Sequence, residues 1–188
     1  MIESSFGNLV IERFALAKAI WREVFAVHEA VLEGAAAAME RILADTAQKP
    51  RGHYHQAVNK SGTEDKLLGQ CWQWYLDDAK RQSRFYLWAE PVEIPGQAKD
   101  SSWLGASVSI VAIAKHCSVD VLDWVPKQTL PAHAQTEQWL DERVIFSNIA
   151  LQSADSAAIS TTLEPTLREY LAFAVKVDRK CEESLRGE

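Results

Sequence analysis

The sequence Arg-Phe-Tyr-Leu-Trp-Ala-Glu-Pro-Val-Glu at residues 84–93 marks a change in the hydrophobic period of the chain. Before this stretch, apolar residues recur every three or four positions, as they do on one face of a helix. Within it, Phe85, Leu87 and Ala89 alternate with Tyr86 and Trp88, so that large apolar side chains fall on both sides of an extended chain. The stretch therefore predicts the first strand of a sheet that follows a helical region.

Three further strands are expected after this one. Residues 103–115 are apolar on both faces in their second half, which is typical of a central strand. Residues 119–125 predict a third strand that Pro126 would end, residues 127–137 a loop, and residues 143–152 a fourth strand. Because the links are short, we expect an antiparallel meander of about four strands between residues 84 and 152.

The region before the sheet, residues 8–82, is predicted to be helical apart from one loop. Its apolar positions over residues 8–44 are spaced alternately by four and three, which gives a heptad-like seam on a long helix. The seam comprises Val10, Phe14, Ala17, Trp21, Val24, His28, Val31, Ala35, Ala38 and Ile42. Further apolar residues widen the stripe, which favours a helix that lies across a core or forms a helical dimer interface over a free coiled coil. Gly34 is a candidate break in this helix.

The sequence at residues 49–52, Lys-Pro-Arg-Gly, is expected to end the long helix and to begin a loop. A second helix is predicted over residues 63–81, with Ser61 and Glu64 as a capping box. A last helix is predicted over residues 161–184, with Pro165 in its first turn. These patterns together predict a single α+β domain over residues 1–188, in which the sheet packs with a long N-terminal helix, a second helix and a C-terminal helix.

Length, composition and charge restrict the class of protein. The 188 residues are 47% hydrophobic and 24% charged, with a formal net charge of −6, which is typical of a folded globular chain. The negative charge disfavours binding to duplex DNA. No apolar run reaches the roughly 18 residues of a membrane-spanning helix, and the first residues lack a signal-peptide pattern. Three cysteines without a CxxC pair fit reduced thiols, so we expect a cytoplasmic protein without a membrane partner.

Residues 49–60 are the best local candidate for a ligand site. They hold three cations, two histidines and one tyrosine, and no acid. In an extended chain His53 and His55 lie on the same side and could meet one metal or one anion, while Arg51 could hold a phosphate or carboxylate. The alternative interpretation is a solvated loop whose cations are favoured by the end of the preceding helix. The candidate ligand-binding residues are Arg51, His53, Tyr54 and His55; no metal site or cofactor is predicted, because no third ligand is visible nearby.

The seven tryptophans are the unusual feature of the composition. Trp72 and Trp74 are two positions apart and cannot share one face of a helix, so one of them is expected to be exposed or covered by another element. A sheet that is apolar on both faces also needs more cover than three helices supply. The candidate interface residues are Trp21, His28, Trp72, Trp74, Trp88 and Trp103, with ordinary core packing as the alternative for each.

No motif in the sequence identifies an enzyme: GxGxxG, GxxxxGK[ST], GxSxG, HExxH and an EF-hand loop are all missing. The first hypothesis is a non-enzymatic protein-binding or accessory module that acts on a protein partner or as a homodimer. The alternative is a small-molecule- or metal-dependent enzyme with its site around residues 49–60. A third and weaker hypothesis is single-stranded nucleic-acid binding through that loop and exposed aromatics, which the net charge disfavours.

Overall fold

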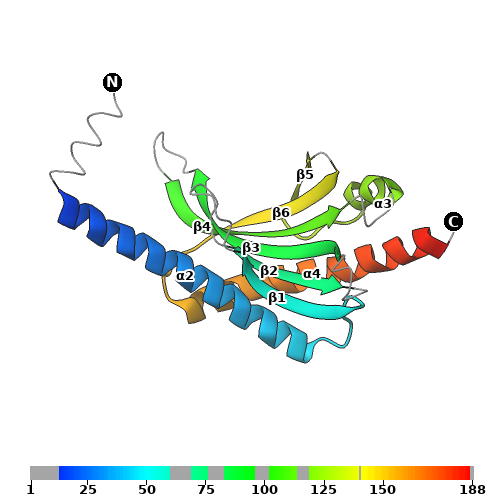
Figure 1. Ribbon diagram of the computed structural model, residues 1–188, viewed down its shortest axis with the longest axis horizontal. Helices are drawn as coiled ribbons and strands as arrows, with labels where there is room; N and C mark the ends of the chain where they lie inside the picture. Colours follow the sequence, from blue (N-terminus) through cyan, green and yellow to red (C-terminus); the bar gives the residue numbers. More distant parts are fainter. Residues whose placement is uncertain are drawn as a thin grey trace, which may run out of the picture.

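The structure is a computed structural model that describes residues 13–59, 69–75, 83–95, 102–113, 119–139 and 141–186. In these residues a sheet of six strands is combined with two long helices (Figure 1). The strands are β1 (His53–Asn59), β2 (Gly69–Tyr75), β3 (Ser83–Pro95), β4 (Ser102–Ile113), β5 (Gln135–Trp139) and β6 (Glu142–Ala150). The helices are α2 (Phe14–Asp45), α3 (Val119–Trp124), the 3-10 turn η1 (Val125–Lys127) and α4 (Ser156–Arg186).

The sheet is antiparallel throughout, in the order β1-β2-β3-β4-β6-β5. Strands β1 to β4 follow one another as a meander, and the β5–β6 hairpin then adds β6 to the free edge of β4. The α+β class and the antiparallel sheet are thus confirmed, with six strands rather than four.

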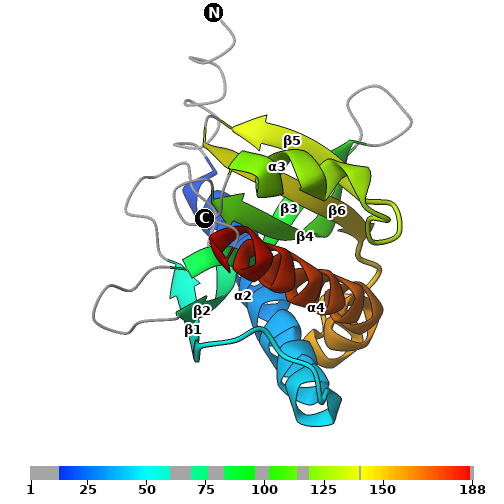
Figure 2. The ribbon, with the colours of Figure 1, turned by 90° about the vertical axis from the view of Figure 1, so that its right-hand side faces the viewer.

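The two long helices cover one face of this sheet. They pack against each other and against β2, β3 and β4, and both lie on the same side of the strands (Figure 2). The core between the layers takes alternate residues of the strands, such as Phe85 and Leu87 of β3, together with Leu167 and Tyr170 of α4. Tyr170 also shares a 2.9 Å hydrogen bond between its hydroxyl and that of Ser147 on β6, which ties α4 to the sheet.

The expected second helix over residues 63–81 is wrong in its described part, because residues 69–75 form β2. Residues 69–72 are all buried, and burial alternates from Trp72 onward, with Trp72 and Trp74 buried and Gln73 and Tyr75 only partly so, which fits a strand in the interior of a sheet. The segment pairs with β1 on one side and β3 on the other. The expected loop before it is also wrong over residues 53–59, which form β1. The proposed capping box at residues 61 and 64 lies outside the described residues.

The expected strand over residues 119–125 is also wrong, because it is the short helix α3 followed by η1. Its buried residues Val121, Leu122 and Val125 follow the spacing of one helix side rather than strict alternation. The expected loop over residues 127–137 gives way at its end to the edge strand β5, which pairs with β6.

The C-terminal helix is confirmed but begins earlier than expected, at Ser156. Asp155 determines this start, because its carboxylate accepts a 2.9 Å hydrogen bond from the backbone N–H of Ala158, which is the geometry of an N-cap. Pro165 consequently lies inside the helix rather than in its first turn. No helix in the described part of the chain is long and apolar enough to cross a membrane.

Candidate functional site

The N-terminal part of α2, residues 14–30, projects beyond the sheet and is named the arm below (Figure 1). The arm is helical because its apolar residues continue the heptad seam and because it contains neither glycine nor proline. The expected start of the helix at residue 8 lies outside the described residues. Helix α2 continues to Asp45, so the apolar stripe that contains the seam runs along both the arm and the part of α2 that packs on the body. The stripe is exposed on the arm and covered against the body.

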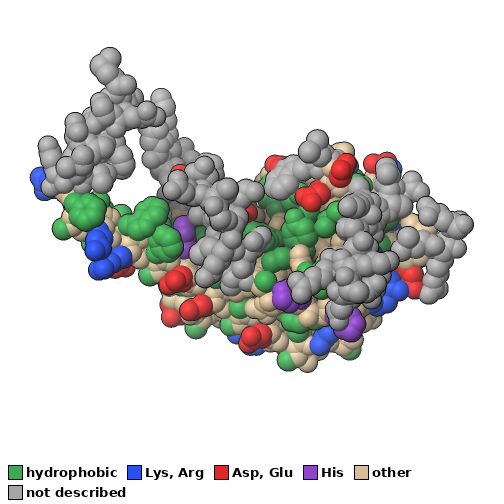
Figure 3. Space-filling model, in the orientation of Figure 1, with side chains coloured by type: hydrophobic (Ala, Val, Ile, Leu, Met, Phe, Trp, Pro, Cys, Tyr) green, Lys and Arg blue, Asp and Glu red, His purple; other side chains and the backbone are tan. Residues whose placement is uncertain are grey.

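The arm carries most of the large hydrophobic residues that are exposed in the described part of the chain. Of seven large hydrophobic residues classed as exposed, six lie on it. They are Phe14 (65%), Leu16 (57%), Ile20 (56%), Trp21 (64%), Val24 (40%) and Phe25 (42%). Hydrophobic side chains therefore cluster along the outer end of α2 in the space-filling view (Figure 3). Because exposed apolar patches are uncommon on folded chains, this end of α2 is the candidate site.

The same stripe is covered in the C-terminal half of α2. Val31, Ala35, Ala38 and Ile42 are fully buried against α4 and the sheet. Gly34 does not break the helix; a Cβ there would lie 2.8 Å from the backbone oxygen of Ser156 and from Cγ2 of Ile159. Gly34 therefore allows α4 to approach α2 closely.

Two residues of the arm that the sequence marked as interface candidates do lie on its stripe. Trp21 packs edge-to-face against Phe25, with ring centroids 5.4 Å apart. His28 lies at the junction of the arm and the body, 6.5 Å from the ring of Phe25. Partial burial lowers the pKa of His28, because burial disfavours the charged imidazolium.

The other interface candidates lie elsewhere. Trp72 and Trp74 are 0% and 3% exposed and belong to the core, so they offer no surface to a partner. Trp88 lies on the sheet face turned away from the helices, half-buried, with its indole over Gly69, where a Cβ would come within 2.2 Å of the ring. Trp103 is in β4, but its side chain lies outside the described residues.

Arg51, the main anion-binding candidate of residues 49–60, is already engaged within the chain. Its Nε donates to Asp178 over 3.0 Å, and its guanidinium pairs with Glu182 over 2.7 Å. Asp178, 2% exposed, also pairs with Arg84, which is 4% exposed. This cluster connects the segment before β1, the start of β3 and the C-terminal part of α4, so the contacts of Arg51 are structural.

The remaining candidates of this segment lie on β1, at the edge of the sheet. His53 and His55 project on the same side of the strand, as the sequence predicts, and both are exposed. Tyr54 packs on Trp74 with ring centroids 5.4 Å apart, and burial raises the pKa of Tyr54 to about 12. The structure thus brings the two histidines together but directs Arg51 and Tyr54 to structural contacts. No group of three possible metal ligands occurs among the described residues.

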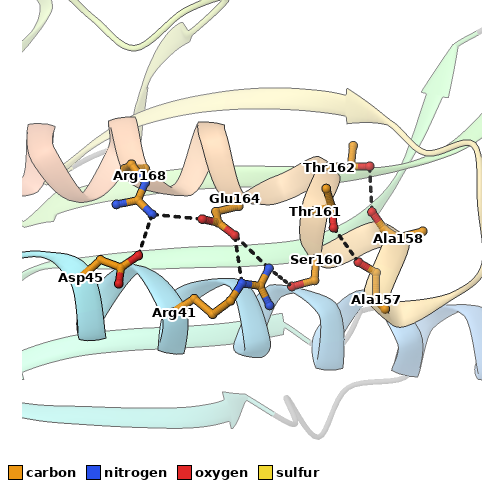
Figure 4. A network of polar contacts seen from close by, with 9 residues as sticks. All are labelled: Arg41, Asp45, Ala157, Ala158, Ser160, Thr161, Thr162, Glu164 and Arg168. Carbon is orange, nitrogen blue, oxygen red and sulfur yellow. Dashed lines mark hydrogen bonds and ion pairs between the residues drawn. The ribbon is translucent and has the colours of Figure 1, made fainter.

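A shallow groove of about 460 Å³ lies between α2 and the start of α4. Arg41 is held in it by hydrogen bonds to Glu164 (3.0 Å) and Ser160 (2.9 Å), and Arg168 joins Glu164 to Asp45 (Figure 4). These charges satisfy one another across the two helices. The groove is therefore better explained as the polar rim of the α2–α4 contact than as a ligand site.

The chain was compared with protein-family models, curated proteins and solved structures, and none of the three comparisons gives a match. The choice of the arm as the candidate site therefore rests on the exposure of its apolar residues alone. The sequence pattern places Phe14 and Val24 on the seam, but among the residues of the arm only Trp21 and His28 were interface candidates. The signal that was missed is the position of the aromatic residues, because both aromatics of the seam, Phe14 and Trp21, lie before His28 and none lies after it.

Proposed function

We propose that the protein is a non-enzymatic association module, and that the arm is the surface through which it binds another polypeptide chain. One observation carries this proposal: the stripe that packs the body continues along the arm with larger side chains that remain exposed. Burying a Phe side chain contributes about 1.5–3 kcal/mol before the entropic cost of association is subtracted. Three such aromatics on one helix face are the usual composition of an interface centre.

The alternative, an enzyme with a ligand site around residues 49–60, has less support. Asp178 and Glu182 neutralise Arg51, and Tyr54 is committed to Trp74. His53 and His55 are the remaining support for a ligand site, and they lie on β1 at the edge of the sheet, where both are exposed. The arm, in contrast, has an exposed apolar surface that needs cover.

Site-specific photo-crosslinking tests this function. The photoreactive residue p-benzoylphenylalanine replaces Trp21 in one variant and Ala19 in a second, both in the full chain. Ala19 is exposed and lies about 200° around the helix from Trp21, so it serves as a matched control on the polar face.

The proposal predicts that irradiation joins position 21, and not position 19, to a second polypeptide, in cells or in the purified protein. It is overturned if position 21 gives no intermolecular product in either setting, or if both positions react equally. A product that joins position 21 only to its own chain would also overturn it, because the stripe would then be covered within the molecule.

A further inference from the structure

The charges along one flank of α2, from the arm to the first turn beyond it, follow a simple order. Lys18, Arg22, Glu29 and Glu33 fall within a sector about 60° wide beside the apolar stripe. The two bases precede the two acids along the helix, and basic side chains accordingly lie near the outer end of α2 and acidic ones nearer the body (Figure 3). None of the four forms an ion pair with another described residue.

Because bases come first and acids come later, two copies of this flank that run in opposite directions can place a base of one copy beside an acid of the other. In an antiparallel pair of identical helices, the same flank of both helices lies on the same side of the contact. With the two-fold axis near Glu23, Lys18 then lies beside the partner's Glu29, while Arg22 lies close to its own copy near the axis. Lys18 and Glu29 of one chain are about 16 Å apart along the helix, too far to pair within it. In a parallel pair this flank would meet the opposite flank, where Glu23 is the one charged residue of the arm.

The apolar stripe fits the same alignment. With the two-fold axis near Glu23, Trp21 packs against the partner's Val24, and the small Ala17 faces the partner's His28. The aromatic pair of Trp21 and Phe25 then lies at the centre of the contact in both copies. Three exposed aromatics and three aliphatics from each chain could bury about 1,000 Å² in total, near the lower limit for a specific interface.

We propose that the polypeptide covering the arm is a second copy of this protein, and that the two arms pair antiparallel with Lys18 beside the partner's Glu29. This inference rests on the proposed function, because it names the chain that the arm binds. It also predicts that association weakens as salt concentration rises, since the flanking charges remain near solvent.

Charge reversal tests the pairing. Lys18→Glu and Glu29→Lys are made singly and together in the full chain, and the dissociation constant of the dimer is measured by sedimentation velocity. Each single variant places like charges together twice in the dimer and is expected to weaken it about tenfold. The double variant restores opposite charges at both places and is expected to return within about twofold of the unaltered chain.

Lys176→Glu is the matched control for Lys18→Glu. Lys176 is an exposed residue of α4, so this substitution changes the charge by the same amount away from the arm. It should leave the dimer unchanged, and circular dichroism checks that every variant keeps its helix. The inference is overturned if the single variants bind as tightly as the unaltered chain, or if the double variant is no tighter than the single ones.

The two proposals fail in different ways. If the unaltered chain is monomeric and position 21 crosslinks to a different protein, the second copy is excluded while the association function stands. If it is monomeric and position 21 crosslinks to nothing, both proposals are wrong.

Discussion

The two halves of α2 share one hydrophobic repeat but differ in what covers it. In the half against the body, the seam residues Ala35 and Ala38 are small and fully buried, and Gly34 admits α4 to close contact. On the arm, the seam carries Phe14 and Trp21, which are about two-thirds exposed. Small residues permit the close approach of a helix in the same chain, whereas large ones supply surface to a separate one. The two halves of one continuous stripe thus differ in exposure, and the aromatic residues of the seam lie in the exposed half.

The largest expected effect comes from making the same substitution in the two halves. Ile42→Ala removes a fully buried side chain and should lower the free energy of unfolding by about 3 kcal/mol. Ile20→Ala removes one that is 56% exposed and should change unfolding of the isolated chain by less than about 0.5 kcal/mol. Urea denaturation of dilute samples measures both. Equal losses in the two variants would contradict the division of α2.

A smaller effect is expected at the close contact of α2 with α4. Gly34→Ala gains about 1 kcal/mol in helix propensity, but its Cβ would lie 2.8 Å from the backbone oxygen of Ser156. Because backbone cannot move aside as a flexible side chain can, we expect the free energy of unfolding to fall by about 1–2 kcal/mol, as measured by thermal unfolding. Ala26→Gly on the arm provides the contrast and should cost only the propensity. A stabilised Gly34→Ala protein would show that the contact is looser than described.

The smallest effect is the pH dependence at the junction of the two halves. Burial lowers the pKa of His28 below 6.5 in the folded chain, so the unfolded chain binds a proton more readily. The contribution of His28 to stability is therefore fully present above pH 6.5 and is lost as pH falls through its folded pKa. We expect a change of less than about 1 kcal/mol between pH 7.5 and pH 5. Subtracting the melting profile of His28→Gln isolates this contribution, and a stability difference that stays constant or shrinks as pH rises from 5 to 7.5 would refute the assignment.

Local patterns in the sequence were enough to predict the elements with a clear period. The long N-terminal helix, β3, β4, β6 and the C-terminal helix follow from repeats of 3.6 or two that extend over many residues. Short segments were assigned wrongly where both periods fit, as at residues 119–125. At Trp72 and Trp74, the conflict with a helical face was itself the signal of a strand, since two residues two apart share a face only when extended.

Contacts between distant parts of the chain could not be predicted in this way. Arg51 resembled a free anion-binding cation because its partner, Asp178, lies 127 positions away. The exposure of Trp21 was equally hidden, because a heptad seam shows which face is apolar and not where the body ends. For the candidate site, the sequence supplied the stripe and the structure supplied its boundary at residues 30–31.

The measurement that tests the central claim most directly is the mass of the particle in solution, taken by sedimentation velocity for the unaltered chain and for Trp21→Ala. We expect the unaltered protein to have a particle mass of twice the 21.1 kDa chain mass. Trp21→Ala should dissociate into single chains at concentrations where the unaltered protein is dimeric, and its unfolding at high dilution should be unchanged. The pairing of two arms would be contradicted if the unaltered protein has a particle mass of 21.1 kDa at every concentration at which it stays soluble.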